Sequence, residues 1–275
     1  MNPGVMYGDA TLPRGIRSRI VRDINGLDVH MLEAGYETSA EGAPRPLVVL
    51  LHGFSELAYS WRKVMLPLAV AGYHVVAPDQ RGYGRTTGWD ASYDGDLASF
   101  RFLNLVRDVL GLVHALGYDR VAAVIGHDFG SSVAAWAALL RPDVFGSVAL
   151  MSAPFSGPPP LPPASSKAAT DIHSDLAALD PPRKHYQWYY STREADGNMR
   201  HCPQGVHAFL RAYYHHKSAD WTANKPHRLG AWTAVELAKL PTYYVMPRDL
   251  GMAATVAVEM PSASGNRRLP LADGG

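Results

Sequence analysis

One short stretch of the sequence, residues 121–130, places a carboxylate in a tight turn between two regular elements. Residues 121–125 form an apolar run that is typical of a buried strand, and apolar residues recur at helical spacing after the turn. The turn has the pattern G-x-D-x-G, in which Gly126 and Gly130 flank Asp128. A strand, a sharp turn and a helix form the context of a nucleophile elbow. The pattern therefore indicates Asp128 as a nucleophile, and the alternative is that Asp128 only caps the helix.

The elements that would position this turn can be predicted from the spacing of apolar residues. Six segments are predicted as strands: 16–22, 27–34, 47–51, 73–78, 121–125 and 146–151. Asn25-Gly26, between the first two, is a hairpin signal. Residues 61–71 and 100–116 have the periodicity of helices, as does the stretch after Gly130. Strands that alternate with helices favour an α/β fold with a doubly wound, mostly parallel sheet.

Three motifs stand at the ends of predicted strands. They are Leu-His-Gly-Phe at residues 51–54, Asp-Gln-Arg-Gly-Tyr-Gly at 79–84 and Gly-His-Asp-Phe-Gly at 126–130. In this order and spacing they resemble the α/β-hydrolase fold, and more narrowly its epoxide hydrolase branch. The resemblance runs from about residue 16 to 151 and continues more loosely through a helical lid. An Asp at the nucleophile position narrows the choice to epoxide hydrolases and haloalkane dehalogenases.

The resemblance implies a two-step hydrolase chemistry at Asp128. A carboxylate can attack the carbon of an epoxide or an alkyl halide and form an alkyl-enzyme ester. Water then attacks the ester, and negative charge develops on an oxygen of Asp128 itself. The family assigns the backbone N–H groups of Phe54 and Phe129 to an oxyanion hole for this charge. It assigns structural roles in the elbow and its neighbouring loop to His52, Gly53, Gly126, His127 and Gly130.

Epoxides and halides need different help as they open. Dehalogenases that resemble this chain supply side-chain donors next to the nucleophile and after His-Gly, where Phe129 and Phe54 have none. An epoxide oxygen needs a proton donor, a role that the family gives to lid tyrosines. The segment His-Tyr-Gln-Trp-Tyr-Tyr at residues 185–190 is similar to the lid segment with the first such tyrosine, and Tyr186 is the matching position. We therefore expect a small apolar or aryl epoxide as substrate, and no cofactor.

The C-terminal part departs from the family pattern. The family implies a His that activates water and an acid that orients it, both after the lid. Residues 263–275 show no strand pattern, and residues 152–154 offer no carboxylate. We expect a core at 1–154, a Pro-rich linker and helical lid at 155–262, an irregular tail, and a sheet without its last strands. Impaired hydrolysis and self-association through the strand at 146–151 follow from this expectation.

Composition excludes several other classes of protein. The chain has 275 residues, of which 47% are hydrophobic and 19% charged, and its net charge of +1 argues against nucleic acid as a partner. We find neither a signal peptide nor an apolar run long enough to span a membrane. Cys202 is the only cysteine, which fits a reducing, cytoplasmic location, and it lacks partners at zinc-ligand spacing, so no metal is expected.

Two other functions compete with an epoxide hydrolase. A non-catalytic α/β-hydrolase-like protein could bind an apolar ligand or a partner through the same fold. A haloalkane dehalogenase-like hydrolase would share the Asp nucleophile. A split enzyme completed by another chain is a third, minor alternative.

Overall fold

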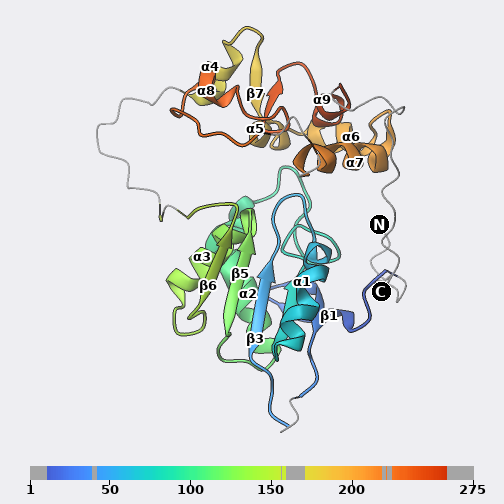
Figure 1. Cartoon of the computed structure of the whole chain (residues 1–275), viewed down its shortest axis with the longest axis vertical. Helices are drawn as coiled ribbons and strands as arrows, with labels where there is room; N and C mark the ends of the chain where they lie inside the picture. Colours follow the sequence, from blue (N-terminus) through green and yellow to red (C-terminus); the bar gives the residue numbers. More distant parts are fainter. Residues whose placement is uncertain are drawn as a thin grey trace. The chain divides into compact units, whose positions relative to one another are not determined.

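The computed structural model consists of two compact units, residues 1–160 and 161–275, each described here by itself (Figure 1). It describes residues 11–38, 42–155, 157–158, 171–218, 221 and 225–258. Most of the predicted Pro-rich linker and the whole of the predicted tail lie outside the described residues. Among the described residues, no helix is long and apolar enough to cross a bilayer.

The first unit is built on a six-stranded sheet with the order β1-β2-β4-β3-β5-β6. Its strands are β1 (Ile16–Ile24), β2 (Leu27–Ala34), β3 (Leu47–Leu51), β4 (His74–Pro78), β5 (Ala123–His127) and β6 (Val148–Met151). β1 and β2 form an antiparallel hairpin, β2 pairs antiparallel with β4, and all pairs from β4 to β6 are parallel. The predicted α/β sheet, mostly parallel, is therefore confirmed.

The strand before the elbow begins later than the sequence predicts. The prediction placed it at residues 121–125, whereas β5 runs from Ala123 to His127. Val121 forms only an isolated bridge to Phe145, outside the main ladder. The apolar side chain of Val121 favoured a strand, but a residue joins a sheet only where a neighbouring strand pairs with it, and β3 pairs with β5 from Ala123 onward.

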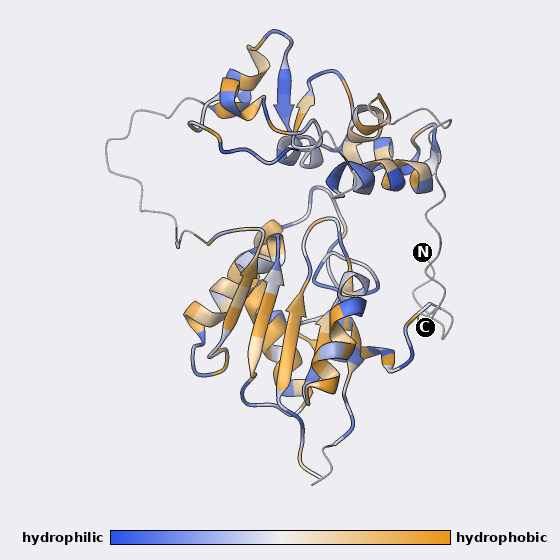
Figure 2. Cartoon of the chain, in the orientation of Figure 1, coloured by the Kyte–Doolittle hydropathy of each residue, from blue (hydrophilic) through white to orange (hydrophobic). Residues whose placement is uncertain are grey.

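Helices cover both faces of this sheet. α1 (Arg62–Val70) follows the short 3₁₀ helix η1 (Ala58–Trp61), α2 (Phe102–Ala115) follows η2 (Leu97–Phe100), and α3 is Phe129–Leu140. Successive side chains of a strand point to opposite faces, and β3 is buried on both. Val49 packs in the core beneath α2 and α3, whereas Val48 packs with Met65 of α1. Figure 2 shows the resulting concentration of hydrophobic residues in the strands.

The second unit is mainly helical and has its own core. It contains α4 (Ile172–Ala177), β7 (Arg183–His185), α5 (Tyr186–Tyr190), α6 (Glu194–Arg200), α7 (Gly205–Lys217), α8 (Ala234–Leu237), β8 (Val245–Pro247) and α9 (Met252–Val258). β7 and β8 pair antiparallel, an interaction that the sequence did not predict. Aromatic side chains such as Tyr189, Phe209 and Tyr213 fill the core together with Met246 and Met252.

We predict that β6 promotes self-association. Among the described residues β6 pairs with β5 alone, and its Val148, Leu150 and Met151 are 44%, 39% and 45% exposed. An exposed apolar edge strand is a template for pairing with another chain. Light scattering after gel filtration should show concentration-dependent association that Val148→Lys reduces. Val70→Lys, a control at an 89% exposed valine on α1, should leave association unchanged. A wild-type chain that stays monomeric at all concentrations would refute the prediction.

Candidate active site

Asp128 occupies a strained turn between β5 and α3. Its backbone has φ 53° and ψ −120°, a conformation that non-glycine residues seldom adopt. The Asp128 N–H donates to the Met151 carbonyl at 2.9 Å, and the Ser131 N–H donates to the Asp128 carbonyl at 3.0 Å. Hydrogen bonds on both sides therefore hold the turn in this conformation. The structure thus has the strand, turn and helix that the sequence predicted.

Three glycines allow the backbones around Asp128 to approach closely. A Cβ atom on Gly126 would overlap the carbonyl oxygen of Gly130. A Cβ atom on Gly130 would overlap the carbonyl oxygen of Leu51, at the end of β3. On Gly53 it would overlap the Cβ of Asp128. The G-x-D-x-G spacing and the glycine after His52 therefore have a steric cause, because a side chain at any of the three positions would overlap the turn or the end of β3.

The Asp128 carboxylate faces the loop after β3. The Phe54 N–H donates to its Oδ1 at 3.0 Å, although the two residues are 74 positions apart. The side chain makes no capping hydrogen bond to α3, so the alternative of a helix cap is wrong. Among the described residues, no group donates a hydrogen bond to Oδ2. One carboxylate oxygen is thus held by a backbone donor, and the other is available for chemistry.

Phe129 directly follows Asp128. Its ring stacks on Phe102 with centroids 5.7 Å apart, and Phe102 stacks in turn on Trp136 at 6.2 Å. These rings form an apolar wall between α2 and α3. The use of the Phe129 N–H as a second oxyanion donor stays a prediction.

His52 links the Gly53–Phe54 turn to the loop after β4. The Gln80 N–H donates to its Nε2 at 3.1 Å, so the proton of the neutral ring lies on Nδ1, which donates to the Gly53 carbonyl at 2.9 Å. Burial lowers the pKa of His52 and favours this neutral form. The ring therefore orients the turn from which Phe54 donates.

Asp79 closes the loop formed by residues 79–85. Its Oδ1 accepts from the Ala58 N–H at 2.9 Å, and its Oδ2 accepts from the Arg85 N–H at 3.0 Å. Oδ2 also lies 2.7 Å from Nδ1 of His30, whose Nε2 lies 2.8 Å from the Ser18 hydroxyl. Burial acts to raise the pKa of Asp79, but these hydrogen bonds outweigh it and lower the pKa. Ser18, His30 and Asp79 are linked in the order of a Ser-His-Asp triad. Both carboxylate oxygens of Asp79, however, accept hydrogen bonds from backbone N–H groups, which favours a structural role.

The same loop brings Tyr83 within electrostatic reach of Asp128. Its ring packs edge-on against His52, with centroids 4.9 Å apart. Burial, and then the charge of Asp128, raise the pKa of Tyr83 to about 12. A neutral phenol therefore stands within electrostatic reach of Asp128, a feature that sequence reasoning missed because it treated this loop only as turn structure.

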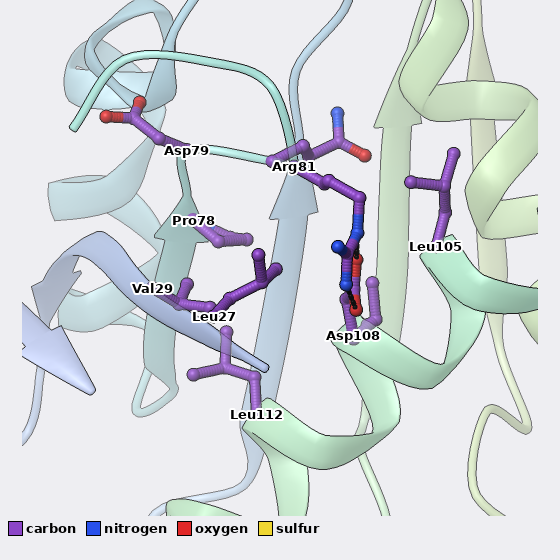
Figure 3. Close-up of a pocket in the computed structure, with 10 residues that line it drawn as sticks. Leu27, Val29, Pro78, Asp79, Arg81, Leu105, Asp108 and Leu112 are labelled. Carbon is purple, nitrogen blue, oxygen red and sulfur yellow. Dashed lines mark hydrogen bonds and ion pairs between the residues drawn. The ribbon is translucent and has the colours of Figure 1, made fainter. Parts of the chain in front are cut away.

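A buried ion pair between Arg81 and Asp108 connects the loop at residues 79–85 to α2 (Figure 3). The Arg81 guanidinium donates from Nε and NH2 to the two Asp108 oxygens at 2.8 and 2.7 Å. The Asn25 side chain also donates to Asp108, at 2.6 Å. The cavity beside the pair, lined by residues such as Leu27 and Leu112, has a volume of about 20 Å³. That volume holds at most about one water molecule, so the cavity is no substrate site.

A second titratable pair includes His127, the residue before Asp128. Nδ1 of His127, the last residue of β5, is 3.0 Å from Oε2 of Glu56, in the loop after β3. Both side chains are partly exposed, at 30% and 26%. An imidazole oriented by a carboxylate is a suitable general base. Sequence reasoning gave His127 only an orienting role and did not single out Glu56, because no local pattern links residues so far apart.

Tyr186 lies in the second unit, where it begins α5. Its N–H donates to the Tyr244 carbonyl at 2.8 Å. Its ring packs against Tyr244 at 5.3 Å, Tyr190 at 6.0 Å and His185 at 4.8 Å between centroids. The half-buried Tyr186 therefore belongs to an aromatic cluster, and its use as a proton donor stays a prediction.

Comparisons with known proteins identify the family to which this chain belongs. A family model described as alpha/beta hydrolase fold matches residues 46–238. Epoxide hydrolase B of Mycobacterium tuberculosis is 42% identical over 153 residues, which cover 54% of this chain and 41% of the relative. Epoxide hydrolase A of the same organism is 43% identical over 132 residues, covering 48% and 37%. The chain thus spans about two fifths of the length of these curated relatives.

Solved structures agree with this result. An epoxide hydrolase from an endophytic Streptomyces is 31% identical with a TM-score of 0.62, covering 88% of this chain and 62% of that chain. A laboratory-evolved variant of a potato epoxide hydrolase is 32% identical with a TM-score of 0.56, covering 72% and 56%. Because the family model matches well over half of the residues, this chain belongs to the α/β-hydrolase fold family, in which it is similar to epoxide hydrolases.

Proposed function

We propose that this chain opens epoxides through nucleophilic attack by Asp128. The observation that carries the proposal is the carboxylate geometry at the strained elbow, where the Phe54 N–H holds Oδ1 and leaves Oδ2 available. The names of the similar proteins support an epoxide rather than another electrophile. The side chains of Phe54 and Phe129 offer no donor to a leaving halide, which counts against the dehalogenase alternative.

In the first half of the reaction, Oδ2 of Asp128 forms a bond to an epoxide carbon as the carbon–oxygen bond of the ring breaks. The ring oxygen keeps the bonding electron pair and takes a proton from the Tyr186 hydroxyl. Oδ1 becomes the carbonyl oxygen of the ester and remains bonded to the Phe54 N–H. A small apolar or aryl epoxide suits this step, because the aromatic wall around Phe129 is apolar.

In the second half, water adds to the ester carbon of Asp128 and negative charge develops on Oδ1. The Phe54 N–H is already placed to stabilise that charge, and we propose that the Phe129 N–H joins it. A base takes one proton from the attacking water and passes it to the departing ester oxygen as the intermediate collapses and the ester bond breaks. The diol leaves, and the other proton of water returns to Tyr186 as the carboxylate is restored.

Hydrolysis needs a base, and few described histidines are suited to the task. His30, His52 and His74 already use both ring nitrogens in hydrogen bonds. In the first unit His127, oriented by Glu56, is the candidate that remains beside Asp128. General-base help is worth roughly 10²–10⁴-fold. Ester formation needs no base, whereas ester hydrolysis depends on this one candidate in the described part of the first unit. We therefore propose that ester formation is faster than ester hydrolysis in this chain.

Intact-protein mass spectrometry tests the proposed function. Incubation with styrene oxide, an aryl epoxide, should add the full mass of one epoxide to the protein, and a proteolytic fragment should locate the adduct at Asp128. Tyr186→Phe should slow adduct formation by about 10²-fold or more, because the ring oxygen loses its proton donor. Tyr214→Phe, at a 42% exposed tyrosine of the same unit, is the matched control.

The possible results separate the alternatives. No adduct on a folded chain would favour the non-catalytic binding protein. An adduct formed from an alkyl bromide but not from the epoxide would favour the dehalogenase. Rapid turnover to diol without a detectable ester would contradict the proposed order of rates, and its loss in His127→Gln would identify the base.

We also propose a cytoplasmic location. Cys202, the single cysteine, is buried and free, which is compatible with a reducing compartment. Detection of the native protein in cell fractions would test this location directly.

A further inference from the structure

The second unit contains a cavity of about 190 Å³ that the proposed epoxide chemistry does not use. Its lining comes from α4 and the residue before it, from β7, from α5 and from the residue after β8. The polar and aromatic residues around it are Asp171, His173, Ser174, Lys184, Trp188 and Arg248. All of them belong to the second unit, so the cavity is formed by this unit alone.

Positive charge dominates the cavity. Lys184 and Arg248 are its cations, and neither forms an ion pair within the part of the chain that the structure describes. The Asp171 carboxylate is already used, because it accepts from the His173 N–H at 3.1 Å and the Ser174 hydroxyl at 3.2 Å. Burial lowers the pKa of Lys184 and the like charge of Arg248 adds to this effect, whereas the charges of Asp249 and Glu194 oppose it. The Lys184 ammonium also lies 4.9 Å from the centroid of the Tyr189 ring. An anion between the two cations would relieve this repulsion.

The cavity also has an aromatic wall and an unsatisfied polar atom. Trp188 is 44% exposed, which is unusual for so large an apolar side chain. Nδ1 of His173 is buried and has no hydrogen-bond partner among the described residues. Buried polar atoms are normally satisfied, so an unsatisfied one at a cavity suits a ligand with an acceptor or a donor.

We propose that this cavity binds a single-ring aromatic oxyanion, such as an aryl carboxylate or an aryl phosphate. The oxyanion lies between Lys184 and Arg248, whose guanidinium can bind two oxygens at once. The ring lies against Trp188, which offers a flat apolar surface. The volume supports a ligand of this size, because a cavity of about 150 Å³ accommodates benzene.

The cavity is separate from the tyrosine proposed to open epoxides. Trp188 follows Tyr186 by two positions in α5, so their side chains point about 160° apart around the helix. The ring of Tyr186 packs against Tyr190 and Tyr244, none of which lines the cavity. Binding of an aromatic anion therefore does not depend on the proposed function.

Calorimetric titration of the full chain in a low-salt buffer tests the proposal. Benzoate and phenyl phosphate serve as the two probes, and at least one should bind with saturation at one site per chain. Benzyl alcohol, which lacks the charge, should bind at least tenfold more weakly. Inorganic phosphate, which lacks the ring, should also bind at least tenfold more weakly than phenyl phosphate. The stronger of the two aromatic probes identifies the oxyanion.

Two charge variants and a control locate the site. Arg248→Gln and Lys184→Met should each weaken binding of the aromatic anion about tenfold or more. Arg228→Gln, at an exposed arginine of the same unit, should leave it unchanged. Arg248 is itself exposed, so its replacement does not disturb the core even if that of Lys184 does. Absence of saturable binding, equal binding of benzyl alcohol, or unchanged affinity in Arg248→Gln would overturn the proposal.

Discussion

Replacing Asp128 with Asn is expected to abolish adduct formation with styrene oxide. An amide oxygen is a far weaker nucleophile than a carboxylate, and removing a nucleophile costs about 10⁴-fold or more in rate. Asn retains an acceptor for the Phe54 N–H, which lies 3.0 Å from Oδ1 in the wild-type chain. The fold should therefore survive while the chemistry is lost. Intact-protein mass spectrometry under the conditions used for the wild type provides the measurement.

Two comparisons make this result specific. Asp119→Asn, at an exposed aspartate of the same unit, should form the adduct at the wild-type rate. A circular dichroism spectrum and a melting curve should match between Asp128→Asn and the wild type. If Asp128→Asn still gains the mass of the epoxide, another carboxylate is being alkylated, and Glu56 would be the first to examine because its side chain is 26% exposed.

Asp108→Ala is expected to lower the free energy of unfolding by about 3–5 kcal/mol, since removing one member of a buried ion pair leaves an uncompensated charge. The side chains of Arg81 and Asp108 are only 6% and 10% exposed. The substitution also removes the acceptor of the Asn25 side chain. Urea unfolding followed by circular dichroism measures the effect as a lower midpoint.

Two further variants separate this effect from general sensitivity to mutation. Asp143→Ala breaks the exposed pair with Arg141, in which the side chains are 38% and 63% exposed, and should change stability little. The double variant Arg81→Met with Asp108→Leu should recover much of the lost stability, because no buried charge remains. Equal destabilisation by Asp108→Ala and Asp143→Ala would show that burial of the pair contributes nothing.

The sequence by itself determined the position of the elbow and, to within about two residues, the six strands and the helices α1, α2 and α3 of the first unit. Strands such as β3 are short apolar runs, and their periodicity depends only on neighbouring residues. The elbow was equally visible, because the glycines at 126 and 130 meet a local steric requirement of a tight turn. Tyr186 was found by a motif alone, so its role has no support from geometry and stays a prediction.

The tertiary structure decided which groups surround Asp128. The Phe54 N–H reaches Asp128 across 74 positions, and Glu56 reaches His127 across 71. Neither contact has a signature in the chain, because strands far apart in the sequence become neighbours only when the sheet assembles. The same holds for the pairing of β7 with β8 and for the cavity at Lys184. Local spacing thus predicted where the Asp128 turn lies, and only long-range packing decided which groups hold and orient the Asp128 carboxylate.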